Sequence, residues 1–83
     1  MNVTIKYFAS IREAIGQGSE TRQTSALTLA DLRDELLAAS PTHAASLARG
    51  TAVRMALNQV MADEAELVTD GCEIAFFPPV TGG

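Results

Sequence analysis

The most informative part of the sequence is CEIAFFPPVTGG, residues 72–83. Its first half alternates with the two-residue period of a β-strand, so that one face carries Cys72, Ile74 and Phe76. The Pro-Pro pair that follows donates no backbone hydrogen bonds and therefore ends a sheet strand. We expect a last strand at residues 72–77 that passes directly into an extended, flexible tail.

A second strand pattern lies near the start of the sequence, at residues 3–8. Val3, Ile5 and Tyr7 share one face, which we expect to point into the core. Phe8 falls on the opposite face, and Phe77 does the same in the last strand. Each of the two strands is therefore expected to leave one aromatic ring outside the core.

One long helical pattern lies between these strands, beginning at Thr28. Thr28 is expected to cap it together with Asp31, and Pro41 ends it at or just before residue 40. An apolar stripe predicts the buried side, formed by Leu29, Leu32, Leu36 and Leu37. The charged residues are expected to point outward, namely Asp31, Arg33, Asp34 and Glu35.

Shorter elements fill the rest of the sequence. A short helix with the spacing of a capping box, Ser10 to Glu13, is expected to stop at Gly16. The other expected elements are an exposed strand at 19–24, a helical turn or two at 42–49 stopped by Gly50, a strand at 53–57, a turn at 58–59 and an exposed loop at 63–66. This order predicts an α+β domain in which a mixed sheet packs on one main helix.

Length and charge limit the function. The 83 residues are 47% hydrophobic, which favours one folded domain at 1–77 followed by the tail at 78–83. The formal net charge of −4 argues against nucleic acid and anionic membranes as partners and favours a basic protein partner. The sequence contains neither a membrane-spanning run nor a secretory signal pattern, so a cytoplasmic location is expected.

Cysteine and histidine are too few for a disulfide framework or a zinc site. The sequence contains one of each, Cys72 and His43. Cys72 shares the apolar face of the last strand and is expected to be a buried structural thiol. His43 is expected to lie on the surface. We expect no metal site and no cofactor bound by the chain itself.

The tail carries the reactive chemistry. Residues 78–83 span at most about 20 Å when fully extended, and Gly82 and Gly83 have no Cβ, so they fit a narrow channel. The α-carboxylate of Gly83 is ionised at neutral pH and is a poor electrophile. ATP overcomes this through an acyl-adenylate, from which a sulfur donor yields a thiocarboxylate and an amine yields an amide.

These residues resemble a known family, the small sulfur-carrying subunits of molybdopterin synthase. The most specific segment is the ending Phe-Phe-Pro-Pro-Val-Thr-Gly-Gly at 76–83, preceded by Asp70-Gly71. Supporting segments are Tyr-Phe-Ala-Ser-Ile-Arg-Glu at 7–13 and Ala-Leu-Asn-Gln at 56–59. Between residues 16 and 52 the agreement is in pattern alone.

The resemblance implies a β-grasp, ubiquitin-like fold and a carrier role. A ubiquitin-activating-type enzyme would use ATP to adenylate Gly83, and a sulfur donor protein would convert it to a thiocarboxylate. The tail residues Pro78, Pro79, Val80, Thr81 and Gly82 would then enter the large synthase subunit, in an assembly of two small and two large subunits. There the sulfur would pass to cyclic pyranopterin monophosphate and build the molybdopterin dithiolene.

The strand parities predict a docking surface for such a partner. In a β-grasp sheet the first and last strands are parallel neighbours, so Phe8 and Phe77 are expected to lie together, with Met61 beside them. An exposed aromatic patch next to a tail is typical of a protein interface. Arg12 is expected to pair with an acidic group of the partner.

Three alternatives remain open at this point. The same tail chemistry serves carriers of other pathways, such as the one that builds the thiazole of thiamine. A ubiquitin-like modifier would instead form isopeptide bonds, although Lys6 is the only lysine, which argues against chains linked through lysine. A plain binding module would use the Phe8 and Phe77 surface and would not need the terminal glycines.

Overall fold

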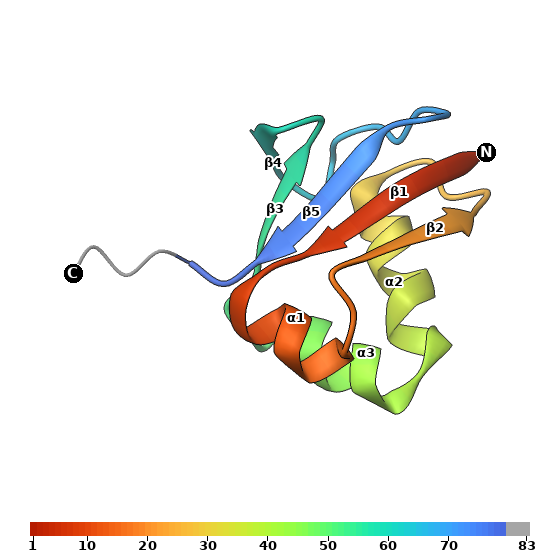
Figure 1. Ribbon diagram of the computed structural model, residues 1–83. Coiled ribbons are helices and arrows are strands. Elements are labelled where there is room, and N and C mark those ends of the chain that lie inside the picture. The colour runs from red at the N-terminus through yellow and green to blue at the C-terminus, as the bar shows by residue number, and fades with distance from the viewer. Residues whose placement is uncertain (80–83) are drawn as a thin grey trace.

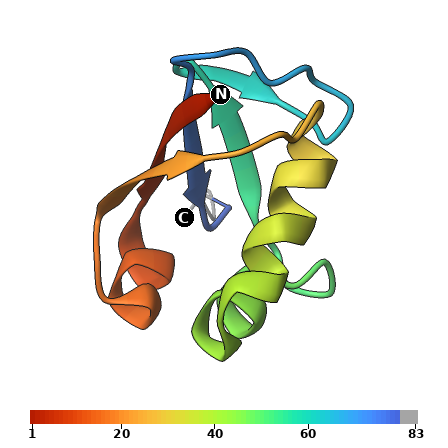
Figure 2. The same ribbon diagram turned by 90° about the vertical axis from the view of Figure 1, so that its right-hand side faces the viewer.

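A five-stranded mixed sheet forms one layer of the protein in the computed structural model, which describes residues 1–79 (Figure 1). The elements in chain order are β1 (Asn2–Tyr7), α1 (Ala9–Ile15), β2 (Ser19–Gln23), α2 (Leu29–Ala39), α3 (Pro41–Leu47), β3 (Arg54–Leu57), β4 (Val60–Ala62) and β5 (Glu73–Phe77). The strand order is β2-β1-β5-β3-β4, in which β1 and β5 are parallel and all other neighbours are antiparallel. α2 covers one face of this sheet (Figure 2). The predicted α+β architecture is confirmed.

The core lies between the sheet and α2, as the alternation of the first and last strands predicted. Ile5 and Ile74 are directly paired across β1 and β5, and both are 0% exposed. Tyr7 and Phe76 form the next pair on the same face and stack with their ring centroids 6.2 Å apart. From α2, the predicted stripe buries Leu29, Leu32 and Leu36 completely. Cys72 is also buried, as expected.

The helix ends are set by local chemistry, and one prediction there is wrong. Gly16 adopts a left-handed conformation with φ 88° and ends α1, and the Thr28 hydroxyl accepts a hydrogen bond of 3.2 Å from the Asp31 amide at the start of α2. Both were predicted. The predicted Ser10 cap is absent, because α1 already begins at Ala9 and its N-cap is Phe8.

Arg33 is buried and does not point outward as predicted. Its Nε donates to the Leu47 carbonyl at 2.7 Å and its Nη2 donates to the Ala48 carbonyl at 3.1 Å. These are carbonyls at the end of α3, where no helical partner remains for them. α3 packs back on α2 and covers the side of α2 that carries Arg33. The predicted stop at Gly50 is wrong, because α3 already ends at Leu47 and its last carbonyls accept from Arg33.

His43 is also more buried than predicted, with 13% of its side chain exposed. Its Nε2 lies 3.2 Å from a Glu20 carboxylate oxygen, and its Nδ1 lies 2.7 Å from the Ser40 hydroxyl. The same Glu20 oxygen accepts a hydrogen bond of 3.0 Å from the Tyr7 hydroxyl. This polar cluster joins the α2–α3 corner to β1 and β2. Proximity to the buried Tyr7, which sequence alone did not indicate, explains why His43 is covered.

The β3–β4 hairpin was only partly predicted. The turn at Asn58 and Gln59 is confirmed, and both residues have positive φ angles, of 49° and 69°. Such a two-residue turn matches the twist of paired strands. β4 follows it and pairs with β3, although no pattern in residues 60–62 predicted a separate strand.

Two further observations concern the described residues 1–79. No helix there has the length and apolar character needed to cross a membrane. In the same residues, no group of three or more His, Cys, Asp or Glu side chains is arranged to hold a metal ion.

Replacing Arg33 is expected to test the clamp on α3. Arg33→Ala leaves the Leu47 and Ala48 carbonyls without a partner in a buried place, which should lower the free energy of unfolding by about 2–4 kcal/mol. Urea unfolding followed by circular dichroism measures this. Arg54→Ala, at an exposed position, should change it by no more than about 0.5 kcal/mol. Equal losses in the two variants would contradict the clamp.

The single tyrosine allows a direct test of the cluster around Glu20. Burial raises the pKa of Tyr7 above its ordinary value of 10.0, and the hydrogen bond to Glu20 raises it further. Because the folded pKa is the higher one, this contribution to stability is complete below pH 10 and is lost as the pH rises above it. An alkaline titration of tyrosinate absorbance should therefore show ionisation above the ordinary value, together with unfolding.

The variant Glu20→Gln provides the control for this titration. It removes the carboxylate but leaves Tyr7 buried, so the pKa of Tyr7 should move back only part of the way towards its ordinary value. A wild-type chain that ionises near pH 10 while still folded would contradict the assignment.

Candidate functional site

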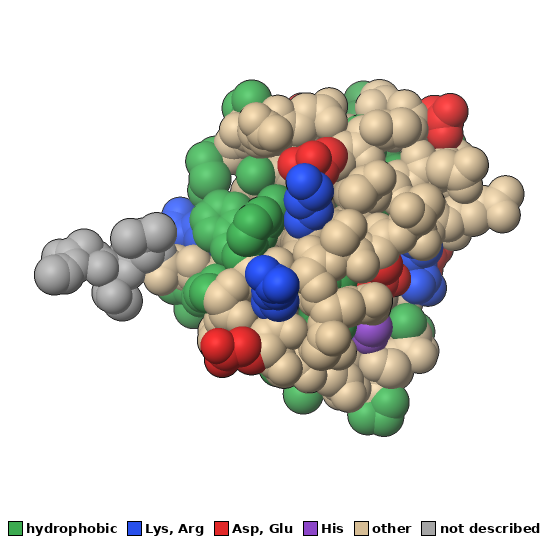
Figure 3. All heavy atoms as spheres, in the orientation of Figure 1, with side chains coloured by type: hydrophobic (Ala, Val, Ile, Leu, Met, Phe, Trp, Pro, Cys, Tyr) green, Lys and Arg blue, Asp and Glu red, His purple; other side chains and the backbone are tan. Residues whose placement is uncertain are grey.

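The face of the sheet opposite α2 is open and carries the candidate site (Figure 3). Alternation turns Phe8, Phe77 and Arg54 to this face, because their strand neighbours Tyr7, Phe76 and Met55 are buried. The pairing of Ala56 with both Ala75 and Met61 continues the same face across β5, β3 and β4.

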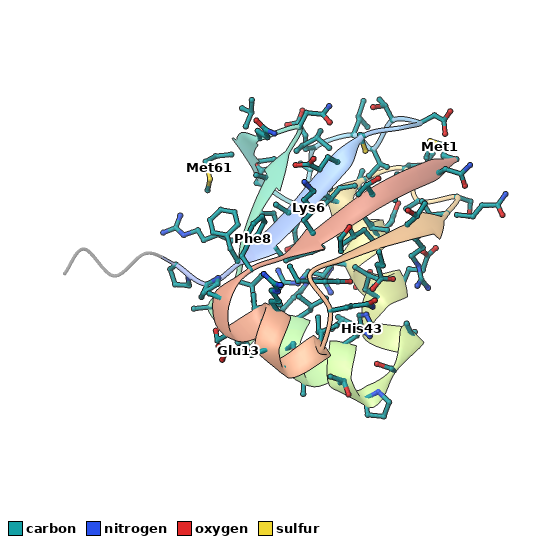
Figure 4. All side chains as sticks on the ribbon, in the orientation of Figure 1. Met1, Lys6, Phe8, Glu13, His43 and Met61 are labelled. Atoms are coloured by element: carbon teal, nitrogen blue, oxygen red, sulfur yellow. The ribbon has the colours of Figure 1, made fainter. Side chains whose placement is uncertain are left out.

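Apolar side chains gather on this face at the end from which the tail leaves (Figure 3). We define the sheet patch as Phe8, Ala56, Met61, Ala75 and Phe77. Phe8 is 46% exposed and Met61 is 58% exposed, and both project from the open face (Figure 4). Phe77 is partly exposed. Phe8, Phe77 and Met61 therefore lie on one face of the sheet, as predicted. Their role as a docking surface for a partner stays a prediction.

The position of Phe8 follows from the way β1 ends. Its amide donates a 3.2 Å hydrogen bond to the Phe76 carbonyl, so β1 remains joined to β5 up to this residue. Its carbonyl then accepts from the amides of Ile11 and Arg12 and starts α1. Ala9, with φ 51°, makes the sharp turn between strand and helix. Held from both sides, Phe8 has a fixed backbone beneath an exposed ring.

Charged side chains surround the sheet patch. Lys6 pairs with Glu73 at 3.4 Å on the open face. Arg12 packs over Gly18 so closely that a Cβ at Gly18 would lie 3.1 Å from the Arg12 Nε. Arg54 is the direct strand partner of Phe77. Arg12 was predicted as part of the site, whereas Arg54 was not, although its alternation with the apolar Met55 was the signal that places it there.

The tail starts beside the sheet patch. Pro78 and Pro79 follow Phe77 at the end of β5 and are partly buried. Pro78 borders a hollow of about 260 Å³, whose other lining residues come from α1, from α3 and from the segment before β3. The remaining predicted tail residues, Val80, Thr81, Gly82 and Gly83, lie outside the described residues.

The amino-acid sequence is similar over nearly its whole length to a family of small proteins. A sequence model of the ThiS family matches residues 5–83. The molybdopterin synthase sulfur carrier subunit of Escherichia coli strain K12 is 36% identical over 81 residues, which cover 98% of this chain and 99% of that protein.

Solved structures show the same fold. The structure of SAMP1 from Haloferax volcanii matches with a TM-score of 0.79 and 26% identity and covers 100% of both chains. A chain in the protein–protein complex of subunits 1 and 2 of molybdopterin-converting factor from Helicobacter pylori matches with a TM-score of 0.72 and 26% identity, again over 100% of both chains. The expected β-grasp fold is confirmed.

A pair of phenylalanine variants is expected to separate the surface from the core. Phe8→Ala should change the free energy of unfolding by less than about 1 kcal/mol, because the ring is half exposed. Phe76→Ala should cost about 3–5 kcal/mol, because that ring is 0% exposed. Urea unfolding of both variants measures the difference, and a loss of stability in Phe8→Ala as large as in Phe76→Ala would show that Phe8 belongs to the core.

Proposed function

The chain belongs to the ThiS family, and we propose that it is the sulfur-carrier subunit of a molybdopterin synthase. The observation that carries this proposal is that the sheet patch lies at the end of β5, where Pro78 and Pro79 begin the segment that ends at Gly83. This arrangement suits a carrier protein. The apolar surface binds the partner, and the adjoining tail brings its terminal carboxyl group to the partner's site.

Gly83 is the residue that carries the sulfur in this proposal. Its carboxylate oxygen attacks the α-phosphorus of ATP on a ubiquitin-activating-type enzyme, which forms the acyl-adenylate and releases pyrophosphate. Sulfide from a donor protein then displaces AMP and leaves a thiocarboxylate. ATP is bound by the activating enzyme, and this chain requires no cofactor of its own.

The acceptor is cyclic pyranopterin monophosphate, held by the large synthase subunit. The thiocarboxylate sulfur forms a bond to a carbon of this substrate while a carbon–oxygen bond at that carbon breaks and its oxygen leaves as water or phosphate. Water then cleaves the bond between sulfur and the Gly83 carbonyl, which restores the carboxylate. The dithiolene needs two sulfurs, so each product consumes two loaded carriers. The acid–base residues and the pterin site belong to the large subunit, and the chain acts as a non-catalytic donor in an assembly of two small and two large subunits in the cytoplasm.

The structure of the Helicobacter pylori complex supports a large-subunit partner, since it joins a chain of this fold to a second subunit. The Escherichia coli relative supports the molybdopterin pathway in preference to the thiamine thiazole. The similarity to SAMP1, the small archaeal modifier protein 1, supports one second candidate, attachment of Gly83 to amines of other proteins.

The mass of the intact chain tests the sulfur-carrier proposal. After incubation with ATP, a sulfur donor and the activating enzyme, a fraction of the chain should gain the mass difference between sulfur and oxygen. Tandem spectra should place that gain on Gly83, because the carboxylate there is the group that the adenylate activates.

A chain that lacks Gly83 is the control, and its carboxylate on Gly82 should gain far less sulfur. If the wild-type chain stays unmodified under these conditions, the carrier proposal fails. If the chain is instead found joined to lysine side chains of other proteins, the proposal that it is a protein modifier replaces the carrier proposal.

A further inference from the structure

The basic side chains of the protein differ in whether they already have a partner. Arg22 pairs with Glu35 at 2.7 Å, Arg49 pairs with Asp34 and Glu64, and Lys6 pairs with Glu73. Arg33 is occupied by the carbonyls at the end of α3. Among residues 1–79, this leaves two arginines whose side chains form neither an ion pair nor a hydrogen bond within that part of the chain, Arg12 and Arg54.

Both of these arginines flank the aromatic pair of the sheet patch. Arg54 stands directly opposite Phe77 on β3. Arg12 lies one helical turn after Phe8, whose carbonyl accepts from its amide at 3.3 Å. Since β5 lies between β1 and β3, the order across this end of the sheet is Phe8, Phe77 and Arg54, and Arg12 follows Phe8 on α1. Basic side chains adjoin the apolar patch in the space-filling view (Figure 3).

We propose that the partner of the sheet patch presents an apolar centre with carboxylates on both sides, and that Arg54 is a determinant of this recognition alongside Arg12. The proposal rests on the function proposed above and names the chemistry of the partner surface. A docked partner removes water from both guanidinium groups, which costs free energy unless carboxylates replace that water. Arginine suits this role because its planar group binds a carboxylate through two hydrogen bonds.

This inference reverses what the net charge indicates. A chain with a formal charge of −4 is expected to attract basic partners. Of the acidic groups near the sheet patch, Glu73 is paired with Lys6. Glu13 lies on α1 next to Arg12, which leaves Arg54 as the more isolated positive charge. Local charge at the contact decides which partner fits, because charges beyond about 8–10 Å are screened at physiological salt.

Binding of the large molybdopterin synthase subunit from the same organism tests the proposal by titration calorimetry. Arg54→Gln should weaken binding about 3–10-fold, and Arg54→Glu should weaken it by more than about 10-fold, since it places like charges together. The loss should shrink when the ionic strength is raised from about 0.05 M to about 0.5 M, because salt screens the lost attraction. Arg12→Gln should behave like Arg54→Gln.

The matched control is Gln23→Glu, at an exposed position of β2 paired with the first residue of β1. It changes the net charge by the same amount as Arg54→Gln but lies at the other end of the sheet, so binding should change less than about twofold. Arg54 is exposed, and unchanged thermal unfolding of its variants confirms that they fold.

The outcomes distinguish this inference from the proposed function. If the wild-type chain does not bind the large subunit, the proposed function fails. If the wild-type chain binds and Phe8→Ala weakens binding, the sheet patch is the interface. If in that case Arg54→Gln binds with the same affinity as Gln23→Glu, the proposed acidic partner surface is wrong. Tighter binding by Arg54→Glu would mean that the partner surface is basic.

Discussion

In the centre of the sheet, parallel pairing joins β1 to β5, from Thr4 opposite Glu73 to Tyr7 opposite Phe76. This register places the apolar side chains of both strands on one face, against α2. A shift by one residue would turn every side chain of a strand to the opposite face. The same register brings Phe8 next to the end of β5 on the open face. The core and the candidate site are therefore fixed by one set of backbone hydrogen bonds.

The two faces of the sheet serve different purposes because of this arrangement. One face is filled with fully buried side chains and holds the fold together. The other carries the Phe8 ring and the Met61 thioether, which contribute less to folding because about half of their surface stays exposed. Stability and the proposed partner recognition thus fall on different residues of the same strands, so a change to Phe8 need not disturb its buried neighbour Tyr7.

Local sequence patterns predicted the fold well wherever short-range chemistry decides the structure. The caps at Gly16 and Thr28 and the alternation of β1 and β5 needed no knowledge of distant contacts. Arg33 and His43 were misplaced for the opposite reason, since each is buried by an element that is distant in sequence or follows a sharp bend. A hydrophobic pattern predicts which apolar side chains are buried. It does not predict which polar side chains are buried with hydrogen-bond partners in the interior.

The candidate site shows the same division. Phe8, Phe77 and Met61 were found because parity along a strand is a local property. Arg54 was not predicted as a site residue, although the alternation along its strand also gives its face. It stands out only when the ion pairs of all basic side chains are compared. That comparison requires the ion pairs of the folded chain, in which most of the basic side chains are already occupied. The charge that remains for a partner is therefore a property of the structure, and its sign at the sheet patch is opposite to that of the whole chain.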